Sequence, residues 1–296
     1  MRSAPWHSLP ASGLFARSTF KRVLLSDEPI RRRKSEFPSF CRVRTYTPCM
    51  KTILITGASR GIGAAAARLA AGRGYAVCIN YRKNAPAADL LVREIEGKGG
   101  KAIAIQADVA VEPEVVRLFE KVDTSLGPLS ALVNNAGIVE QQMRLDQMTA
   151  DRLQRIFNTN VTASFLCSRE AVRRMSTRYG GKGGVIVNVS SMAAQLGAPG
   201  EYIDYAATKA AVDALTVGLA KEVAAEGIRV NAVRPGIIHT EIHASGGEPN
   251  RVERVKDSIP MKRGGLPQEV ANAILWLVSD EASYCAGAFI NVSGGR

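Results

Sequence analysis

The sequence predicts an α/β protein built on one doubly wound parallel sheet of about seven strands, with helices on both faces. From residue 50 onward, short runs rich in Val, Ile and Ala alternate with longer segments of helical periodicity. This is the pattern of parallel strands joined by crossover helices. A glycine-rich stretch, residues 57–63, joins the first run to the first helical segment. We therefore expect a single domain whose ligand lies at the carboxyl ends of the strands.

The expected elements follow one another along the chain. Strands are expected where apolar and β-branched residues form short runs, at residues 52–55, 76–81, 101–106, 129–133, 184–191, 228–233 and 288–292. Helices are expected at residues 64–71, 88–98, 112–125, 151–179 (one long helix or two in succession), around 205–209, and at 267–280. Residues 237–265 lack a regular period and contain glycines and prolines. We expect them to form a long loop that closes over the substrate.

Length and composition are those of an ordinary globular domain. The chain has 296 residues, of which 46% are hydrophobic and 22% are charged. No apolar run approaches the roughly 18 residues that a membrane span needs, so we expect no membrane association. The five cysteines match no metal-ligand spacing. They indicate reduced thiols and therefore a cytoplasmic protein.

The net charge of +12 is concentrated near the N-terminus. The first fifty residues hold ten basic and three acidic residues, against 29 and 24 in the remainder. The rest of the chain is thus only mildly basic, and we expect no nucleic-acid partner. Residues 1–49 contain several prolines and no sustained period, which predicts a disordered leader or an over-extended start before a domain spanning 50–296. An organellar transit peptide (residues 1–26 lack acids) and a basic targeting or nucleic-acid-binding patch at 31–34 are the alternatives.

The glycine-rich stretch predicts a dinucleotide-binding turn. It reads Gly-Ala-Ser-Arg-Gly-Ile-Gly between a strand and a helix. Such a turn aims backbone N–H groups and a helix N-terminus at a pyrophosphate, and glycine lets the phosphate approach the backbone. The spacing differs from the common Rossmann pattern, and a purely structural turn is the alternative. The expected cofactor contacts are Gly57, Ser59, Arg60, Gly61, Ile62 and Gly63.

The end of the second strand favours NADP(H) over NAD(H). NAD-binding units commonly place an acid near this strand end to hold the ribose hydroxyls. Here Tyr81 is followed by Arg82, and no acid is present. Arg82 and Arg60 are suited to bind a 2′-phosphate, because a guanidinium donates to two phosphate oxygens at once. The alternative is that both arginines are ordinary surface residues.

Tyr205 and Lys209 are the expected acid–base pair. Four residues apart on a helix, they share one face. A neighbouring ammonium favours the phenolate and lowers the pKa of the tyrosine from about 10 towards the range useful for catalysis. The spacing alone is more typical of a solvated helix face. Two further observations favour a site: Asn160 lies among apolar residues of a helical segment, and a β-branched strand ends in Ser190 and Ser191.

Taken in this order, the motifs resemble those of the short-chain dehydrogenase/reductase family, of the type with roughly 250 residues. The resemblance covers residues 50–296. It rests on Thr56 to Gly63, Asn134-Asn135-Ala136-Gly137, Asn160, Ser191, Tyr205-x-x-x-Lys209 and Pro235-Gly236-x-x-x-Thr240. Within the family the chain is most similar to uncharacterised bacterial oxidoreductases. It is less close to glucose 1-dehydrogenases and 3-oxoacyl-carrier-protein reductases.

The resemblance implies a role for each residue. Tyr205 is the general acid–base, Lys209 lowers its pKa and holds the nicotinamide ribose, Ser191 polarises the carbonyl, and Asn160 anchors a water relay towards Lys209. The other implied cofactor contacts are Tyr81, Arg82, Asp108, Val109, Asn134, Ala136, Gly137, Pro235, Gly236, Ile238 and Thr240. Thirteen residues separate Ser191 from Tyr205, one more than in many family members, which leaves Ser190 and Ser191 both open as the catalytic serine. A homo-oligomer, tetramer or dimer, is also implied.

We therefore expect an NADP(H)-dependent oxidoreductase that transfers a hydride between the nicotinamide and a small-molecule carbonyl or secondary alcohol. One alternative is an NAD-dependent sugar dehydrogenase of the glucose type. Another is a non-catalytic dinucleotide-sensing protein, which has no need of Asn160, Ser191, Tyr205 and Lys209 together. His239 and His243 lack a third ligand, so no metal site is expected.

Overall fold

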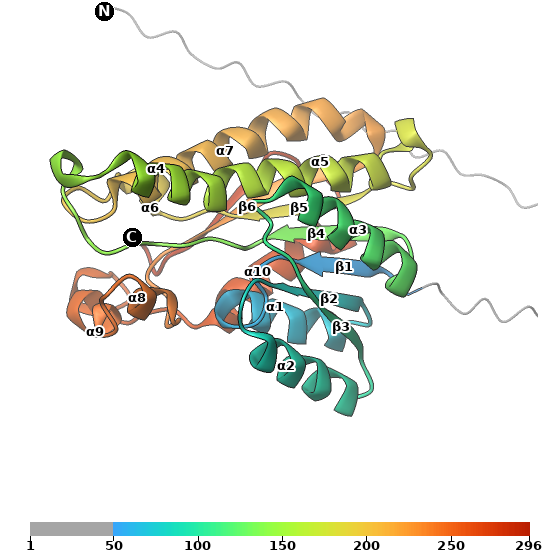
Figure 1. The fold of residues 1–296 in the computed structure, drawn as a ribbon, viewed down its shortest axis with the longest axis horizontal. Coiled ribbons are helices and arrows are strands. Elements are labelled where there is room, and N and C mark those ends of the chain that lie inside the picture. The colour runs from blue at the N-terminus through green and yellow to red at the C-terminus, as the bar shows by residue number, and fades with distance from the viewer. Residues whose placement is uncertain (1–49) are drawn as a thin grey trace, which may run out of the picture. The chain divides into compact units, whose positions relative to one another are not determined.

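A computed structural model describes residues 50–296; the leader expected at residues 1–49 lies outside them. The seven strands are all parallel and follow the order β3-β2-β1-β4-β5-β6-β7 (Figure 1). They are β1 (Thr52–Ile55), β2 (Ala76–Tyr81), β3 (Lys101–Gln106), β4 (Leu129–Asn134), β5 (Gly184–Val189), β6 (Ile228–Pro235) and β7 (Phe289–Val292). The expected sheet is thereby confirmed.

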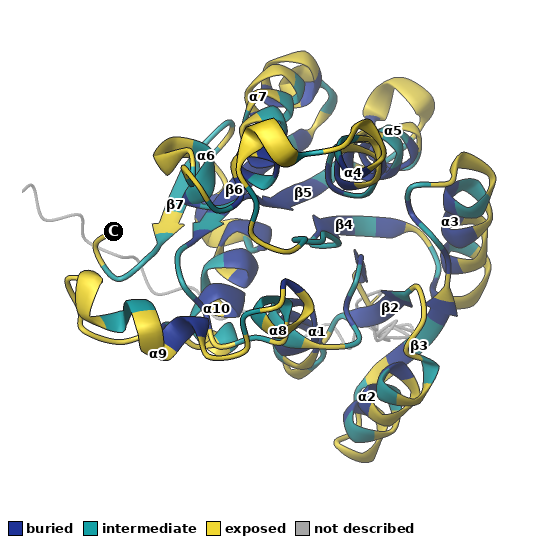
Figure 2. Ribbon diagram, turned by 60° about the vertical axis from the view of Figure 1, so that its left-hand side comes forward, coloured by how far each residue is buried: buried dark blue, intermediate teal, exposed yellow. Residues whose placement is uncertain are grey.

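Helices cover both faces of the sheet (Figure 2). One face carries α1 (Gly61–Gly72), α2 (Ala85–Gly97) and α10 (Pro267–Val278). The other carries α3 (Glu112–Leu126), α5 (Ala163–Met175) and α7 (Ile203–Val223), with α4 (Ala150–Phe157) packed against α7. The strands are buried on both faces and therefore read as continuous apolar runs rather than as alternating ones.

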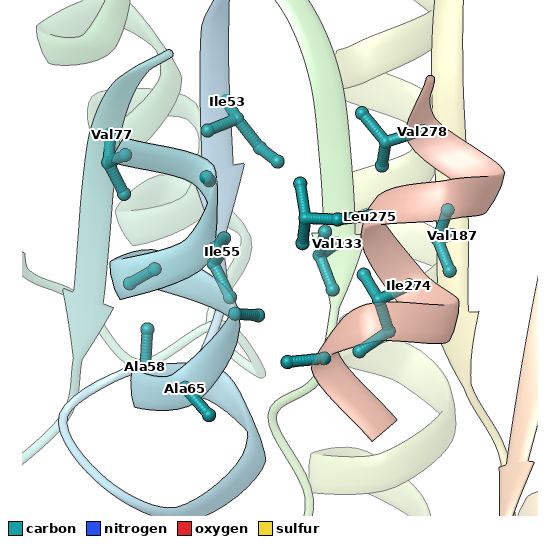
Figure 3. Packing of buried hydrophobic residues seen from close by; sticks show 14 of the residues in the cluster. Ile53, Ile55, Ala58, Ala65, Val77, Val133, Val187, Ile274, Leu275 and Val278 are labelled. Atoms are coloured by element: carbon teal, nitrogen blue, oxygen red, sulfur yellow. The ribbon is translucent and has the colours of Figure 1, made fainter. Parts of the chain in front are cut away.

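The core beneath α1 and α10 shows why these two helices pack closely. Helix α1 is built largely from alanine, and Ala64, Ala65, Ala66, Ala67 and Ala70 are buried. The small side chains let α10 come near, so that residues from both helices meet the sheet (Figure 3). Those labelled in the figure include Ala65, Ile274, Leu275 and Val278 from the helices, and Ile55, Val133 and Val187 from the strands. Burying one Leu or Ile side chain contributes about 1.5–3 kcal/mol.

The chain reverses its direction of winding at β1. From β1 it proceeds outward through β2 to β3, then crosses to β4 on the other side of β1. Helices on opposite faces then leave a crevice beyond the carboxyl ends of β1 and β4, where ligands of open α/β sheets bind. The fold thus positions the glycine-rich stretch after β1 beside residues 134–137 after β4.

Several element boundaries differ from the expectations. Residues 237–265 are not a plain loop, because they contain α8 (Ile242–Ser245), α9 (Arg251–Val255) and a 3₁₀ turn at Lys256–Ser258. The segment 151–179 is divided by a turn of π-helix at Asn158–Thr162 between α4 and α5. A short helix, α6 (Ala193–Leu196), follows β5, and α1 begins at Gly61 rather than at residue 64. Across residues 50–296, no helix combines the length and apolar character that crossing a bilayer requires.

Candidate active site

The glycine-rich turn lies against the loop that follows β4. Gly57 has φ +60°, and a Cβ there would lie 2.9 Å from Cα of Ala136. Gly61, also at positive φ, is the first residue of α1. Only glycine combines this backbone geometry with such close approach. The N-terminus of α1 therefore points its free N–H groups into the crevice, as an anion site requires.

Thr56 and Asn135 hold the two loops together, a role that motif reading did not assign to them. The Thr56 hydroxyl accepts hydrogen bonds from the backbone N–H groups of Asn135 and Ala136, both at 3.0 Å. The Asn135 side-chain amide donates to the carbonyls of Thr56 (2.9 Å) and Gly57 (3.1 Å). The sequence did hold a signal for this role, because Thr56 follows β1 and Asn135 follows β4, so each central strand is followed by a polar residue.

Asn80, inside buried β2, fixes the same turn from the other side. Its Oδ1 accepts from the N–H of Gly57 at 3.2 Å, and its Nδ2 donates to the carbonyl of Ala107 at 3.1 Å. A buried amide in an apolar strand must be hydrogen-bonded, so its position in the sequence already predicted a partner. The partner's identity depends on the alignment of β1, β2 and β3.

A cavity of about 570 Å³ extends from the glycine turn to helix α7, which carries Tyr205 and Lys209. Most of the predicted site residues line it: Gly57, Ser59, Arg60, Gly61, Ile62, Tyr81, Arg82, Asp108, Val109, Ala136, Gly137, Ser191, Tyr205, Lys209, Pro235, Gly236, Ile238 and Thr240. The structure thus brings together segments from both halves of the domain. Three predicted residues, Gly63, Asn134 and Asn160, are not part of the lining.

Gly63 and Asn134, predicted as cofactor contacts, do not line the cavity, and their close contacts are with the protein itself. A Cβ on Gly63 would lie 2.8 Å from Cα of Ala58, so this glycine serves close packing. Asn134 is buried and donates to Ser168 (3.0 Å) and to Asn188 (2.9 Å). Its amide therefore ties β4 to α5 and β5, because a polar group in the middle of a sheet needs partners within the protein.

Basic residues gather where the adenosine end of a dinucleotide would lie. Arg82 follows β2, and its Nε lies 2.9 Å from a carboxylate oxygen of Asp108, which follows β3. Arg60 is exposed, and its Nη2 donates to the hydroxyl of Ser245 on α8 at 3.3 Å. Lys83 also lines the cavity. Their side chains are accessible to a phosphate, although the Arg82 charge is partly balanced by Asp108.

Tyr205 and Lys209 lie on the cavity side of α7. The Lys209 ammonium lies 5.6 Å from the centroid of the Tyr205 ring and donates to the backbone carbonyl of Val189 at 2.8 Å. Burial lowers the pKa of Lys209 to about 8. The two side chains are thus brought together as the four-residue spacing predicted.

Contrary to the expectation from the Tyr205–Lys209 spacing, the pKa of Tyr205 lies above its ordinary value. Burial raises the pKa of Tyr205, and a hydrogen bond with Ser191 opposes that rise only in part. The cause is that desolvation disfavours the phenolate, while an ammonium 5.6 Å from the ring does not compensate for it. Tyr205 is therefore a protonated phenol at neutral pH.

The two serines after β5 face different ways. The Ser191 hydroxyl interacts with Tyr205 and accepts from the backbone N–H of Ala193 at 3.1 Å. The Ser190 hydroxyl is buried and donates to the backbone carbonyl of Lys209 at 3.3 Å. Of the two hydroxyls, Ser191 is thus the one beside the phenol.

Asn160 links the loop after β4 to helix α7. It lies in the π-helical turn, a local irregularity that is frequent at functional sites. Its Oδ1 accepts from the N–H of Ile138 at 2.8 Å, and its Nδ2 donates to the carbonyl of Ile138 (3.0 Å) and the hydroxyl of Thr208 (3.1 Å). Thr208, which motif reading missed, lies between Tyr205 and Lys209 and donates to the carbonyl of Tyr205 at 2.7 Å.

Comparisons with known proteins agree with this fold. Residues 57–296 match a family model described as enoyl-(acyl carrier protein) reductase. The chain is 57% identical over 247 residues to the uncharacterized oxidoreductase YgfF of Escherichia coli (strain K12), a match covering 83% of this chain and 100% of that protein. It is 41% identical to a 3-oxoacyl-[acyl-carrier-protein] reductase of Synechocystis, covering 82% and 95% of the two chains. A short-chain dehydrogenase from Burkholderia cenocepacia J2315, solved in complex with NADP, superposes with a TM-score of 0.76 at 35% identity, covering 83% and 97%.

Proposed function

The chain belongs to the short-chain dehydrogenase/reductase family of oxidoreductases, and on that premise we propose that it transfers a hydride between NADP(H) and a carbonyl or secondary alcohol, with Tyr205 as the acid–base. One observation carries the proposal. The side chains of Ser191, Tyr205 and Lys209 line the same cavity as a helix N-terminus and a group of basic residues. A reacting carbonyl and a dinucleotide can therefore meet in one cavity.

The residues present fit a dinucleotide phosphate. The N-terminal turn of α1 offers backbone N–H groups, and Gly57 and Gly61 leave the approach open. Arg60, Arg82 and Lys83 provide positive charge at the far end of the cavity. This charge supports NADP(H) over NAD(H), and the related Burkholderia protein was solved with NADP.

When bound, the nicotinamide supplies or accepts the hydride. Tyr205 transfers its phenolic proton to the substrate oxygen in the reducing direction and removes it in the oxidising direction. Because burial raises the pKa of Tyr205, the phenol holds its proton at neutral pH, which suits a proton donor. Ser191, beside the phenol, donates a hydrogen bond that orients the substrate oxygen.

Lys209 and Asn160 assist the proton transfer without exchanging a proton with the substrate. With a pKa of about 8, the Lys209 ammonium is charged at pH 7 and stabilises negative charge that develops on Tyr205. Asn160 fixes Ile138 and Thr208, and so holds the loop after β4 against the catalytic helix. Both are therefore proposed to keep the reacting groups in place.

We expect this protein to associate with further copies of itself. Phe157, Phe165 and Val217, on α4, α5 and α7, expose apolar side chains. Sedimentation velocity of the full chain tests this, and a monomer at micromolar concentration would contradict it.

The test of the proposed function is a panel of ketones, aldehydes and secondary alcohols, followed by the absorbance of the reduced nicotinamide with each cofactor in turn. We expect turnover with NADPH or NADP⁺ to exceed that with NADH or NAD⁺. Faster turnover of sugars with NAD⁺ would instead establish a sugar dehydrogenase. Tight cofactor binding without turnover of any substrate would indicate a dinucleotide sensor.

A further inference from the structure

Four charged side chains meet over the substrate end of the cavity. Arg251 on α9 donates to Glu248 (Nη1, 2.7 Å) and, through Nη2, to Glu201. Arg254, one turn further along α9, contacts the same two carboxylates, with Nη2 3.2 Å from Glu201. Gln142, from the loop after β4, donates to Glu248 at 2.7 Å. We call Glu201, Glu248, Arg251 and Arg254 the lid cluster.

The lid cluster and its partner Gln142 join three segments around α7. Glu201 precedes α7, Gln142 follows β4, and the two arginines belong to the 237–265 segment. Glu201 and Arg251 both line the cavity, together with Tyr202 and Tyr205. The neighbouring lining on this side is apolar and consists of Val139, Met192, Leu196 and Ala198.

The charge of Arg251 is fully engaged within the cluster. Both terminal nitrogens donate to carboxylates, the guanidinium stacks over the Tyr202 ring at 4.8 Å, and the residue is 8% exposed. Burial opposes ionisation of Glu201, but hydrogen bonds from Arg251 and Arg254 outweigh it and hold the pKa of Glu201 below its usual value. Two cations and two anions balance, so the cluster offers no free positive charge to a substrate.

Among residues 50–296, no other charged residue on the cavity wall supplies a free positive charge at the substrate end. Glu241 and Arg296 are exposed and opposite in charge, so together they add no net charge to the wall. Burial lowers the pKa of His243, which leaves the imidazole neutral at pH 7. Lys209 lies beside Tyr205 at the reacting end, and Arg60, like the basic residues after β2, lies at the cofactor end. A carboxylate on the substrate's far end therefore meets Glu201 without a free cation.

We propose that Glu201 is a specificity-determining residue: by neutralising Arg251 it restricts this enzyme to uncharged carbonyl substrates with an apolar substituent and excludes those that carry a carboxylate. This proposal rests on the proposed function and names its substrate class. The substituent packs against Met192, Leu196 and the Tyr202 ring. Removing the negative charge of Glu201 leaves the positive charge of Arg251 only partly balanced in the buried wall of the cavity. The Arg251 guanidinium can then bind a carboxylate of the substrate.

The test uses a matched pair of substrates, methyl benzoylformate and benzoylformate, with the full chain and NADPH. We expect wild type to reduce the ester with a kcat/KM at least tenfold above that for the acid. Glu201→Gln should raise the acid-to-ester ratio at least tenfold. Glu201→Gln combined with Arg251→Met should abolish that gain, because the cation that remains in the cluster, Arg254, is balanced by Glu248. Glu253→Gln is the matched control. It removes an acid that lies on α9, as Arg251 does, and whose partner is the exposed Lys256. This variant should leave the acid-to-ester ratio unchanged.

A second measurement separates this inference from hydride transfer. Calorimetric binding of benzoate and benzamide to the NADP⁺-saturated enzyme needs no reaction, and Glu201→Gln should bind benzoate at least tenfold more tightly than wild type, with benzamide unaffected. If no compound of the ketone, aldehyde and alcohol panel is turned over but benzoate shows this gain, the proposed function fails and the charge inference stands. An unchanged benzoate affinity in a folded variant overturns the inference. Should Glu201→Gln not fold, Glu248→Gln unmasks the same guanidinium and carries the same expectation.

Discussion

The Nε of Arg152 donates to Oδ2 of Asp204 at 2.7 Å, and the two side chains are 5% and 0% exposed. The other Asp204 oxygen accepts from the backbone N–H of Tyr205 at 2.9 Å. Arg152 Nη1 also donates to the carbonyl of Gln141 at 2.7 Å. A single buried ion pair thus joins α4, the loop after β4 and the first turn of the helix that carries the proposed acid–base.

Removing Asp204 tests how much this pair contributes. Asp204→Ala should lower the free energy of unfolding by about 3–5 kcal/mol, because it leaves a buried guanidinium without its counter-charge. Arg152 Nη2 already lacks a partner among the described residues, so nothing there offsets the loss. Urea denaturation measures the change. Asp280→Asn, which breaks the exposed pair with Lys51, should cost only about 0–1 kcal/mol, and an equal effect of both variants would contradict this account.

Tyr205→Phe should retain NADPH binding and lose oxidoreduction. The ring still fills its place on α7, but the proton that the substrate oxygen needs is gone, and general acid–base catalysis contributes about 10²–10⁴-fold. Stopped-flow or steady-state absorbance at saturating NADPH gives the rate, and fluorescence titration gives the affinity. Tyr179→Phe, at an exposed position, is the control. Undiminished turnover in Tyr205→Phe would refute the assignment.

Arg82→Asp should weaken NADPH far more than NADH. Arg82 is one of the basic residues placed for a 2′-phosphate, and a charge-assisted hydrogen bond contributes about 1.5–3 kcal/mol, or roughly a tenfold to hundredfold change in Kd. The same change brings an acid beside Asp108, which disfavours the phosphate further. Titration of both reduced cofactors measures it. Lys98→Asp, away from the cavity, makes the same change in net charge and should affect neither; a similar loss for both cofactors in Arg82→Asp would remove Arg82 as the selecting residue.

The buried ammonium of Lys209 should make stability depend on alkaline pH. Its pKa is about 8 in the folded protein, against 10.5 for an unperturbed lysine. Between pH 8 and pH 10.5 the unfolded chain binds more protons than the folded one. The free energy of unfolding therefore increases as the pH rises, and Lys209 contributes about 3 kcal/mol to this increase over that range. Below pH 8 both states are protonated and the contribution is flat.

Lys209→Met isolates that group from the other titrations. We expect the stability of Lys209→Met relative to wild type, measured as the difference in unfolding free energy, to be highest at pH 7. This difference should shrink as the pH rises from 8 to 10.5, because the wild type becomes more stable over that range. Urea titrations at matched pH values supply the numbers. A difference that is constant over this window would show that Lys209 keeps its ordinary pKa in the folded protein.

Much of the fold and part of the site were predictable from local patterns. The alternation of strands and helices, the glycine turn and the Tyr205–Lys209 spacing each arise within a few residues, where backbone geometry and periodicity decide the outcome. All seven strands were therefore located correctly to within two residues at either end. Most of the predicted site residues also line one cavity, because the carboxyl ends of parallel strands meet at one edge of the sheet.

The orientation of individual side chains depends on contacts between distant segments, so only the tertiary structure decided it. Whether Asn134 faces the cavity or Ser168, and which serine faces Tyr205, follows from how β4, β5 and α7 pack. The direction of the Tyr205 pKa is set by burial that no four-residue spacing reveals.

The lid cluster depends on the same long-range packing, since Glu201 and Arg251 are 50 residues apart in the chain. The 237–265 segment itself lacks the period of a long helix, so its short helices are stabilised by these ion pairs and by contact with the loop after β4. The sequence by itself determined the sheet, the turn and the residue types proposed for catalysis. The charge balance at the proposed substrate end of the cavity was decided by folding, because folding brings Glu201 against the charged residues of the 237–265 segment.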